Sequence, residues 1–165
     1  MQKNIQQASV FTGQIPASSN LAINAVKRLE ASMREELDTV DISTHHTLHD
    51  GVYSRTIMIP AGHLVVGAKV NVSSTIIISG DITLYVDGDP VRLIGYHVIP
   101  ADAGRKQAAY AHLDTHVTMF CQTEAETIEE VEAECTDECE KLISRTDSDN
   151  NIFQVTRESK QCHGR

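Results

Sequence analysis

The chain has 165 residues, of which 41% are apolar and 22% charged, and its formal net charge is −9. This length predicts one domain that buries an apolar core without disulfides or a structural metal. The acidic balance argues against a protein that binds nucleic acid, because phosphate binding needs a basic surface, and it leaves room only for a local basic patch on the centre of the chain. No apolar run is long enough to span a membrane, and the first ten residues lack the apolar stretch of a signal peptide. We therefore expect a cytoplasmic protein with no membrane partner.

Residues 1–19 are polar and predict a loosely held arm. A helix from about Leu21 to Leu37 is expected next, because apolar residues recur there at helical spacing and Ser18, Ser19 or Asn20 can cap its start. The apolar stripe consists of Leu21, Val26, Leu29, Met33 and Leu37. Such a stripe is typical of packing against a sheet or a neighbouring subunit.

Residues 41–51 read DISTHHTLHDG and contain His45, His46 and His49. On a helix, the spacing of three and four residues would present two imidazoles to one metal ion. Thr, Ser, Asp and Gly surround these histidines, so a polar loop with solvated imidazoles is predicted instead. We therefore treat residues 1–51 as an arm, a helix and a histidine-rich loop.

The centre of the chain predicts a β structure over residues 52–122. Short runs rich in Val, Ile, Thr and Tyr alternate there with Gly, Pro and Asp, and turn signals recur every 8–12 residues or so, as in all-β sandwiches and barrels. The predicted strands are Val52–Ile59, Leu64–Asn71, Ser74–Ser79, Asp81–Asp87, Val91–Ile94, His97–Ile99, Ala108–His112 and Thr115–Cys121.

The negative charge is concentrated after the predicted strands. Residues 124–141 hold nine acidic side chains and one lysine, so the rest of the chain is close to neutral. The sequence Thr123–Glu126 fits a capping box, and an acidic amphipathic helix is predicted over 123–146, ending near Ser144. Its apolar stripe consists of Ile128, Val131, Cys135 and Leu142, and its acidic face is expected to be solvated. Residues 147–165 predict a flexible tail.

Four cysteines occur, and without an export signal they are expected to be reduced thiols. They are Cys121, Cys135, Cys139 and Cys162. Cys135 and Cys139 are four residues apart, a weak signal for a metal site. Cys135 falls on the apolar stripe, which favours a small buried hydrophobic side chain.

The segment from Arg55 to Thr115 contains "IPAG" before Gly67, "SGDIT" around Gly80, "GYH" at Tyr96 and "AHLDT" at His112. In order and spacing it resembles the cupin superfamily, in particular small cupin-like proteins of tailed bacteriophages and prophages. The resemblance covers about residues 53–145. It implies a mainly β fold, a small jelly-roll barrel, flanked here by an N-terminal and a C-terminal helix.

Cupin enzymes hold a metal with two His and a Glu from one strand pair and a third His from a later strand. In this chain, the strand after Gly67 has no His and no carboxylate, so the usual H-x-H is absent. His97 and His112 remain in the later strands, with His63 as a further candidate if the strand register differs. Two imidazoles without a carboxylate are a poor metal site. We therefore predict no metal and no cofactor.

A small barrel can instead hold one small ligand, with polar groups directed at it. Arg and Lys side chains bind phosphate or carboxylate, and Tyr can stack on a flat ring. The candidate ligand-binding residues are Arg55, Lys69, Arg92, Tyr96, His97, Arg105, Lys106, Tyr110 and His112. They favour a small anionic ligand, with a nucleotide-derived compound as one candidate. The alternative is that Arg105 and Lys106 are ordinary loop charges and that the tyrosines are packing residues.

Three functions are compatible with these features. The first is a non-catalytic binding protein, which in a phage would sequester a host defence signal. The second is a cupin enzyme, either metal-dependent or a metal-free isomerase in which Asp114 orients His112 as a general base. The third is a structural or assembly protein of the virion. A homo-oligomer is expected in each case, because a small barrel leaves strand edges exposed and two amphipathic helices flank it.

Overall fold

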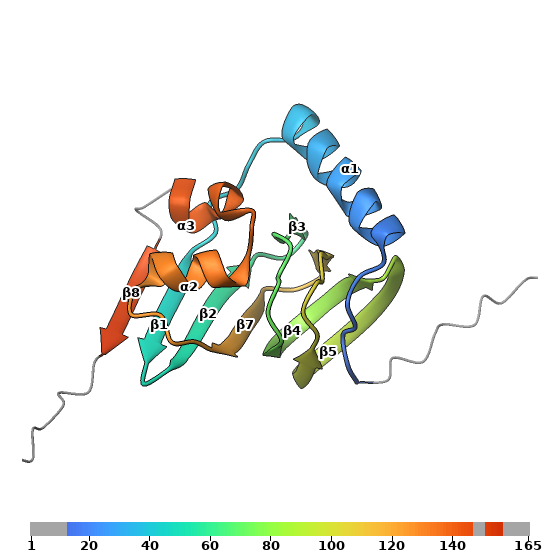
Figure 1. Cartoon of the computed structure of the whole chain (residues 1–165). Helices are drawn as coiled ribbons and strands as arrows, with labels where there is room; N and C mark the ends of the chain where they lie inside the picture. Colours follow the sequence, from blue (N-terminus) through green and yellow to red (C-terminus); the bar gives the residue numbers. More distant parts are fainter. Residues whose placement is uncertain (1–12, 147–150, 157–165) are drawn as a thin grey trace, which may run out of the picture.

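One curled sheet dominates the computed structural model, which describes residues 13–146 and 151–156 (Figure 1). The described part of the chain forms eight strands in the order β3-β6-β4-β7-β2-β1-β8, with β5 paired to β4. The strands are β1 (Thr44–His49), β2 (Val52–Ile59), β3 (Leu64–Val66), β4 (Ser74–Val86), β5 (Asp89–Ala101), β6 (Ala108–Ala111), β7 (Thr115–Gln122) and β8 (Asn151–Thr156). The helices are α1 (Asn20–Glu36), α2 (Ile128–Cys135) and α3 (Ile143–Thr146), with a 3-10 turn η1 (Cys139–Lys141).

The sheet curls because β4 changes its neighbour halfway along its length. Residues 75–79 of β4 pair with β7, whereas residues 82–84 pair with β6. Gly80 lies between the two halves with a φ of +149°, and a Cβ placed on it would lie 2.8 Å from the Cα of Thr115. Only glycine fits this close approach without a shift of the backbone. The bend gives the sheet a concave face, as in a barrel left half open.

Two apolar clusters stabilise the curled sheet. The first lies between β4, β5 and β6 and includes Ile78, Ile82 and Ile99. The second lies between β1, β2, β7 and α2. Its members are Leu48, Tyr53, Cys121, Ile128, Val131 and Cys135. The apolar stripe expected for the acidic segment therefore packs onto the sheet, and α2 covers the end of the sheet formed by β1, β2 and β7 (Figure 1).

The prediction of a mainly β fold flanked by an N-terminal and a C-terminal helical segment is confirmed. The strand boundaries differ in three places. The runs 74–79 and 81–87 form the single strand β4, and the runs 91–94 and 97–99 form β5, because Gly80 and Gly95 are paired within an unbroken antiparallel register. The strand predicted over 64–71 ends at Val66, since Gly67 and Val70 bond instead to the 105–107 segment.

The histidine-rich segment is a strand and not a loop, so that prediction is wrong. Residues 44–49 form β1, which pairs with β2 on one side and with β8 on the other. Thr44, His46 and Leu48 face the core, and alternate residues face outward. The sequence did not predict this strand, because two of its three core-facing residues, Thr44 and His46, are polar and give no alternation of apolar and polar side chains.

Part of the predicted flexible tail is also ordered as a strand. Residues 151–156 form β8, parallel to β1. The remainder of the tail, including Cys162, and the first twelve residues of the N-terminal arm lie outside the described residues.

The acidic helix is shorter than predicted and starts later. It ends at Cys135, whose carbonyl accepts the Asn71 N–H at 2.8 Å, and η1 and α3 follow as separate turns. The capping box is formed by Thr127 and Glu130. Thr123, the predicted cap, instead donates its hydroxyl hydrogen to Glu134. Two TxxE spacings occur in this stretch, and tertiary packing of Ile128 selects the second.

Replacement of Thr127 by alanine is expected to lower the free energy of unfolding by about 1 kcal/mol, because the N-cap acceptor of the Glu130 N–H is lost. Urea denaturation at neutral pH measures the change. Thr127→Ser keeps the hydroxyl and is the matched control, for which we expect a loss of less than about 0.5 kcal/mol. Equal stability of Thr127→Ala and the parent chain would contradict the assigned cap.

Helix α1 begins where predicted, with the Ser19 side chain accepting the Ala22 N–H at 3.2 Å. Only Ala22 and Val26 of α1 are buried, and Leu21 is 78% exposed. An ion pair also holds the helix, because Glu30 lies 3.1 Å from the Nζ of Lys106, a buried residue between β5 and β6. No helix in the described residues is long and apolar enough to cross a membrane.

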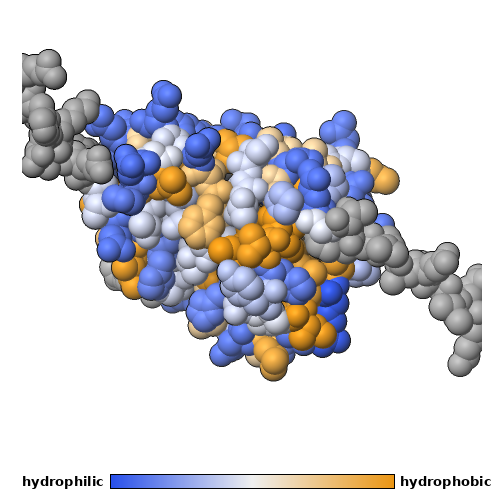
Figure 2. All heavy atoms as spheres, turned by 90° about the horizontal axis from the view of Figure 1, so that it is seen from below, coloured by the Kyte–Doolittle hydropathy of each residue, from blue (hydrophilic) through white to orange (hydrophobic). Residues whose placement is uncertain are grey.

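The side of the molecule seen from below in Figure 2 carries apolar side chains among polar ones. Separately, strand β5 exposes Ile94, Tyr96 and Val98, at 65%, 67% and 56%. These residues alternate along one face of β5. Among the described residues, β5 pairs with β4 on one side, and its other edge is met only by Ile15, at Ala101.

Candidate functional site

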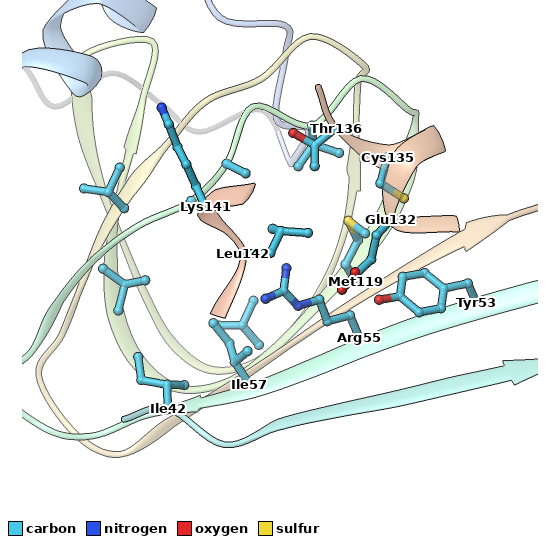
Figure 3. Close-up of a pocket in the computed structure, with 16 residues that line it drawn as sticks. Ile42, Tyr53, Arg55, Ile57, Met119, Glu132, Cys135, Thr136, Lys141 and Leu142 are labelled. Atoms are coloured by element: carbon cyan, nitrogen blue, oxygen red, sulfur yellow. The ribbon is translucent and has the colours of Figure 1, made fainter. Parts of the chain in front are cut away.

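A cavity of about 200 Å³ lies between the concave face of the sheet and the segment from α2 to α3 (Figure 3). Strands β2, β3 and β7 supply one wall, and α2 with residues 141–142 supplies the other. Most of the lining is apolar. The lining residues are Ile42, Tyr53, Arg55, Ile57, Val65, Val66, Gly67, Ala68, Val70, Val117, Met119, Glu132, Cys135, Thr136, Lys141 and Leu142.

Arg55 places a guanidinium group inside this apolar cavity. It lies in the middle of β2, opposite His46 on β1 and Met119 on β7. The chain directs it inward because Tyr53, Arg55 and Ile57 alternate on the same face of β2. Figure 3 shows its guanidinium between Met119 and Leu142.

The Nε atom of Arg55 is buried and has no hydrogen-bond partner in the described part of the chain. Across the described residues, no ion pair engages this guanidinium either. Burial of a charged donor without a partner is costly, so such groups are rare unless something occupies the vacant bonding position. Arg55 is therefore the side chain that distinguishes this cavity from ordinary core.

A neutral hydrogen-bonded pair stands beside Arg55. The His46 Nδ1 and the Tyr53 hydroxyl are 2.9 Å apart, and the His46 Nε2 lies 3.2 Å from the Asn151 Oδ1. The amide oxygen accepts from Nε2, so the proton of the imidazole is assigned to Nε2 and the Tyr53 hydroxyl donates to Nδ1. Burial, with the nearby charge of Arg55, lowers the pKa of His46, and burial raises the pKa of Tyr53. Both groups are therefore uncharged at neutral pH.

The other charged groups at the cavity are already paired. Glu132 is 3% exposed and accepts hydrogen bonds from Ser144 and from the Arg145 Nε, the latter at 2.6 Å. The Lys141 Nζ lies 3.1 Å from the Glu138 Oε1 and 3.6 Å from Glu30. Of the charged groups that line the cavity, Arg55 is the one for which residues 13–146 and 151–156 supply no ion-pair partner.

Of the nine predicted ligand-binding residues, only Arg55 lines the cavity. Arg105 is 3% exposed and donates to the carbonyls of Val72 and Asp102, at 3.0 and 2.7 Å. Lys106 is 1% exposed and donates to Glu138 and to the Gly67 carbonyl. These two side chains have their hydrogen bonds satisfied within the protein.

The remaining predicted residues lie elsewhere on the sheet. Arg92 donates two hydrogen bonds to Asp81, and the His97 Nε2 donates to the Ile94 carbonyl. Tyr96 is exposed, and the backbone N–H of Lys69 donates to Glu138.

Tyr110 packs edge-on against His112, whose Nε2 lies 2.8 Å from the Thr83 hydroxyl. Asp114 accepts the Ala61 N–H at 2.8 Å, so its carboxylate is engaged in a contact between two loops. His112, the predicted general base, therefore contacts Thr83, and Asp114, its predicted partner, contacts Ala61.

Several cavity residues were not predicted from the sequence. Tyr53 and Met119 fall within predicted strands and were not candidates, and Glu132 belongs to the acidic run that was expected to be solvated but is 3% exposed. The one usable signal was the alternation of Tyr53, Arg55 and Ile57, which places a charge between apolar neighbours on a single strand face. His46 gave no signal, because its partners come from β2 and β8.

The metal site of cupin enzymes does not fit the described residues. No group of three or more His, Cys, Asp or Glu side chains gathers there in a metal-binding arrangement. The ring nitrogens of His63, His97 and His112 that form hydrogen bonds point at protein oxygens in separate places.

No family model and no curated protein matches the sequence. Solved structures with a similar fold include a cupin-superfamily protein from Desulfitobacterium hafniense, 13% identical over 54% of this chain and 84% of that chain, with a TM-score of 0.44. Ectoine synthase from P. lautus is 17% identical over 51% and 65% of the two chains, with a TM-score of 0.42. KdgF from Halomonas sp. is 16% identical over 52% and 86%, with a TM-score of 0.41. These likenesses concern the fold, and no activity is carried over from them.

Proposed function

We propose that this protein binds a small organic anion with an apolar body in the cavity beneath α2, and that Arg55 holds the anionic group. The observation that carries the proposal is the buried, unpartnered Nε of Arg55 within apolar walls. A carboxylate would accept two parallel hydrogen bonds from the guanidinium and neutralise its charge.

The cavity supports a compact ligand. Cavities that hold drug-sized molecules usually measure about 300–1,000 Å³, and this one is close to 200 Å³. Its walls come from Ile42, Val65, Val117 and Leu142, which offer contact to hydrocarbon. One unpaired cation suits one negative charge. A monocarboxylate with a short hydrocarbon body meets all three requirements.

Binding of hexanoate, with hexanol as the uncharged control, tests this proposal by titration calorimetry. We expect hexanoate to bind at one molecule per chain and hexanol to bind at least about tenfold more weakly, because only the carboxylate pairs with Arg55. Equal affinities for the two, or no binding of either, would overturn the proposal.

The finer predictions from the sequence concern the natural ligand. A nucleotide-derived ligand and the sequestration of a host defence signal by a phage protein remain predictions. Native mass spectrometry of protein purified without a His tag, with metal analysis of the same sample, tests them. A co-purified molecule of nucleotide mass would support them, and a small carboxylic acid would replace them.

We also propose that the protein forms a homo-oligomer. It is supported by the exposed Ile94, Tyr96 and Val98 on β5, whose outer edge is largely unpaired within the described residues. Such an edge is suited to pairing with a second copy. Light scattering of the purified chain measures the number of subunits.

A further inference from the structure

Two cysteines from distant parts of the sequence meet at the wall of the cavity. Cys121 lies near the end of β7, and Cys135 is the last residue of α2. Their Sγ atoms are 3.7 Å apart, and each residue is 6% exposed. Both are free thiols. Cys135 lines the cavity beneath α2 (Figure 3).

We propose that Cys121 and Cys135 form a redox-sensitive dithiol, which hydrogen peroxide entering the cavity converts to a disulfide. A disulfide has a sulfur–sulfur distance of about 2.05 Å, so the two sulfurs need to approach by less than roughly 2 Å. Cys135 sits at the end of a short helix. A small shift of that helix end or a change of side-chain rotamer supplies this approach.

The surroundings of the pair shift the pKa values of the two thiols in opposite directions. The hydrogen bond from Cys135 lowers the pKa of Cys121, and the charge of Arg105 acts in the same direction, while burial and Glu134 oppose them. The same hydrogen bond, together with burial, raises the pKa of Cys135. The two thiols thus share one hydrogen bond at an Sγ–Sγ distance of 3.7 Å. Thiolates are the reactive form of cysteine.

The reaction balances with peroxide as the oxidant. The thiolate of one cysteine of the pair attacks one peroxide oxygen, the O–O bond breaks, and the leaving hydroxide takes up a proton to become water. The product is a sulfenic acid on that cysteine. The sulfur of the other cysteine then loses its proton and attacks the sulfenic sulfur, and the S–O bond breaks to release a second water. Two thiols are oxidised by two electrons in total, and one peroxide is reduced to two waters.

Cys139 is held apart from this pair. It is partly exposed, and its Sγ donates to the Thr136 carbonyl at 3.1 Å. It is nevertheless a competing thiol, as is Cys162. The test therefore uses a parent variant carrying Cys139→Ser and Cys162→Ser, in which Cys121 and Cys135 are the only cysteines.

Intact mass spectrometry after peroxide treatment gives the decisive result. We expect the parent variant to lose about 2 Da, the two hydrogens of a dithiol, and to regain them with dithiothreitol. Peptide mapping should link the Cys121 and Cys135 peptides. The further change Cys135→Ser should abolish the mass loss. An unchanged mass, or oxygen adducts without the linked peptides, would overturn the proposal.

A second measurement tests the route of the oxidant and rests on the proposed function. Saturating hexanoate should slow oxidation of the parent variant by about fivefold or more, because it fills the cavity next to Cys135. It should leave the rate unchanged once Arg55→Met is added. A rate that hexanoate leaves unchanged in the parent would overturn the route through the cavity. The linked peptides report on the dithiol alone, so failure of the dithiol and failure of the binding proposal are distinguishable.

Discussion

Replacement of Arg55 by methionine is expected to weaken hexanoate binding by about 100-fold or more, since a buried charge-assisted pair contributes roughly 2–5 kcal/mol when one partner is truncated. Methionine has a similar length and keeps the apolar contacts of the side chain with the cavity walls. Only the guanidinium is removed. Titration calorimetry with hexanoate measures the loss of affinity.

The same change is expected to raise the stability of the unliganded protein by about 1–3 kcal/mol, because the buried Nε loses no hydrogen bond and its desolvation cost disappears. A residue retained for binding at a cost in stability behaves in this way. Thermal and urea denaturation without ligand measure the gain.

Arg28→Met is the charge-matched control, because Arg28 is exposed on α1. It should change neither the affinity nor the stability by more than about 0.5 kcal/mol. If Arg55→Met instead destabilises the chain while hexanoate still binds, the guanidinium is a structural group and the binding proposal fails.

Replacement of Lys106 by methionine is expected to lower the free energy of unfolding by about 3–5 kcal/mol, the usual cost of removing one partner from a buried ion pair. The Lys106 Nζ lies 3.1 Å from Glu30, 2.8 Å from Glu138 and 3.0 Å from the Gly67 carbonyl. Without the ammonium group, two half-buried carboxylates face each other, and the attachment of α1 to the sheet is weakened.

The replacement of Lys106 should also change how the stability depends on pH. Burial by itself would raise the pKa of Glu138, but hydrogen bonds from Lys106, the Lys69 backbone and Lys141 lower it from 4.5 to about 2. Burial would also raise the pKa of Glu30, but Lys106, with smaller contributions from Lys141 and Arg34, lowers it. A carboxyl with a depressed pKa in the folded state stabilises the fold above its unfolded pKa. The contribution is lost as the pH falls from about 4.5 toward 2.

Urea denaturation between pH 7 and pH 3 measures both effects. The parent chain should lose stability steeply below about pH 4.5, and Lys106→Met should show a flatter profile from a lower starting value. Lys141→Met is the matched control, since Lys141 meets the same two carboxylates but its side chain is 32% exposed. A surface pair contributes only about 0–1 kcal/mol, so a small loss is expected there. Equal losses for the two variants would contradict a special role for the buried ammonium.

The contrast between Arg55 and the pair Arg105–Lys106 shows why the site could be predicted only in part. All three were candidates because a cation in a small barrel can bind an anion. The sequence carries no information on which cations the protein itself satisfies. The guanidinium of Arg105 donates to the carbonyls of Val72 and Asp102. The ammonium of Lys106 pairs with the carboxylates of Glu30 and Glu138. The Arg55 Nε, by contrast, finds no hydrogen-bond partner among the residues that the structure describes.

Local patterns in the sequence were sufficient to predict most of the secondary structure. Alternating β-branched residues between glycines and prolines determined the strands of the centre, and the Ser19 cap with apolar residues at helical spacing determined α1. These signals are local, because a strand or a helix buries one face of its own repeat. The sequence by itself thus determined the mainly β class, the flanking helical segments and Arg55 as a candidate.

Tertiary structure decided what depends on distant partners. β1 is a strand because polar His46 finds Tyr53 and Asn151 as partners across two interfaces. The helix after the sheet ends at Cys135 because Asn71 bonds to its last carbonyl. The cavity, the place of Arg55 in it and the meeting of Cys121 with Cys135 arise where α2 and the residues after it pack against β2 and β7. Each of these features depends on contacts between residues far apart in the sequence, which a local periodic pattern does not predict.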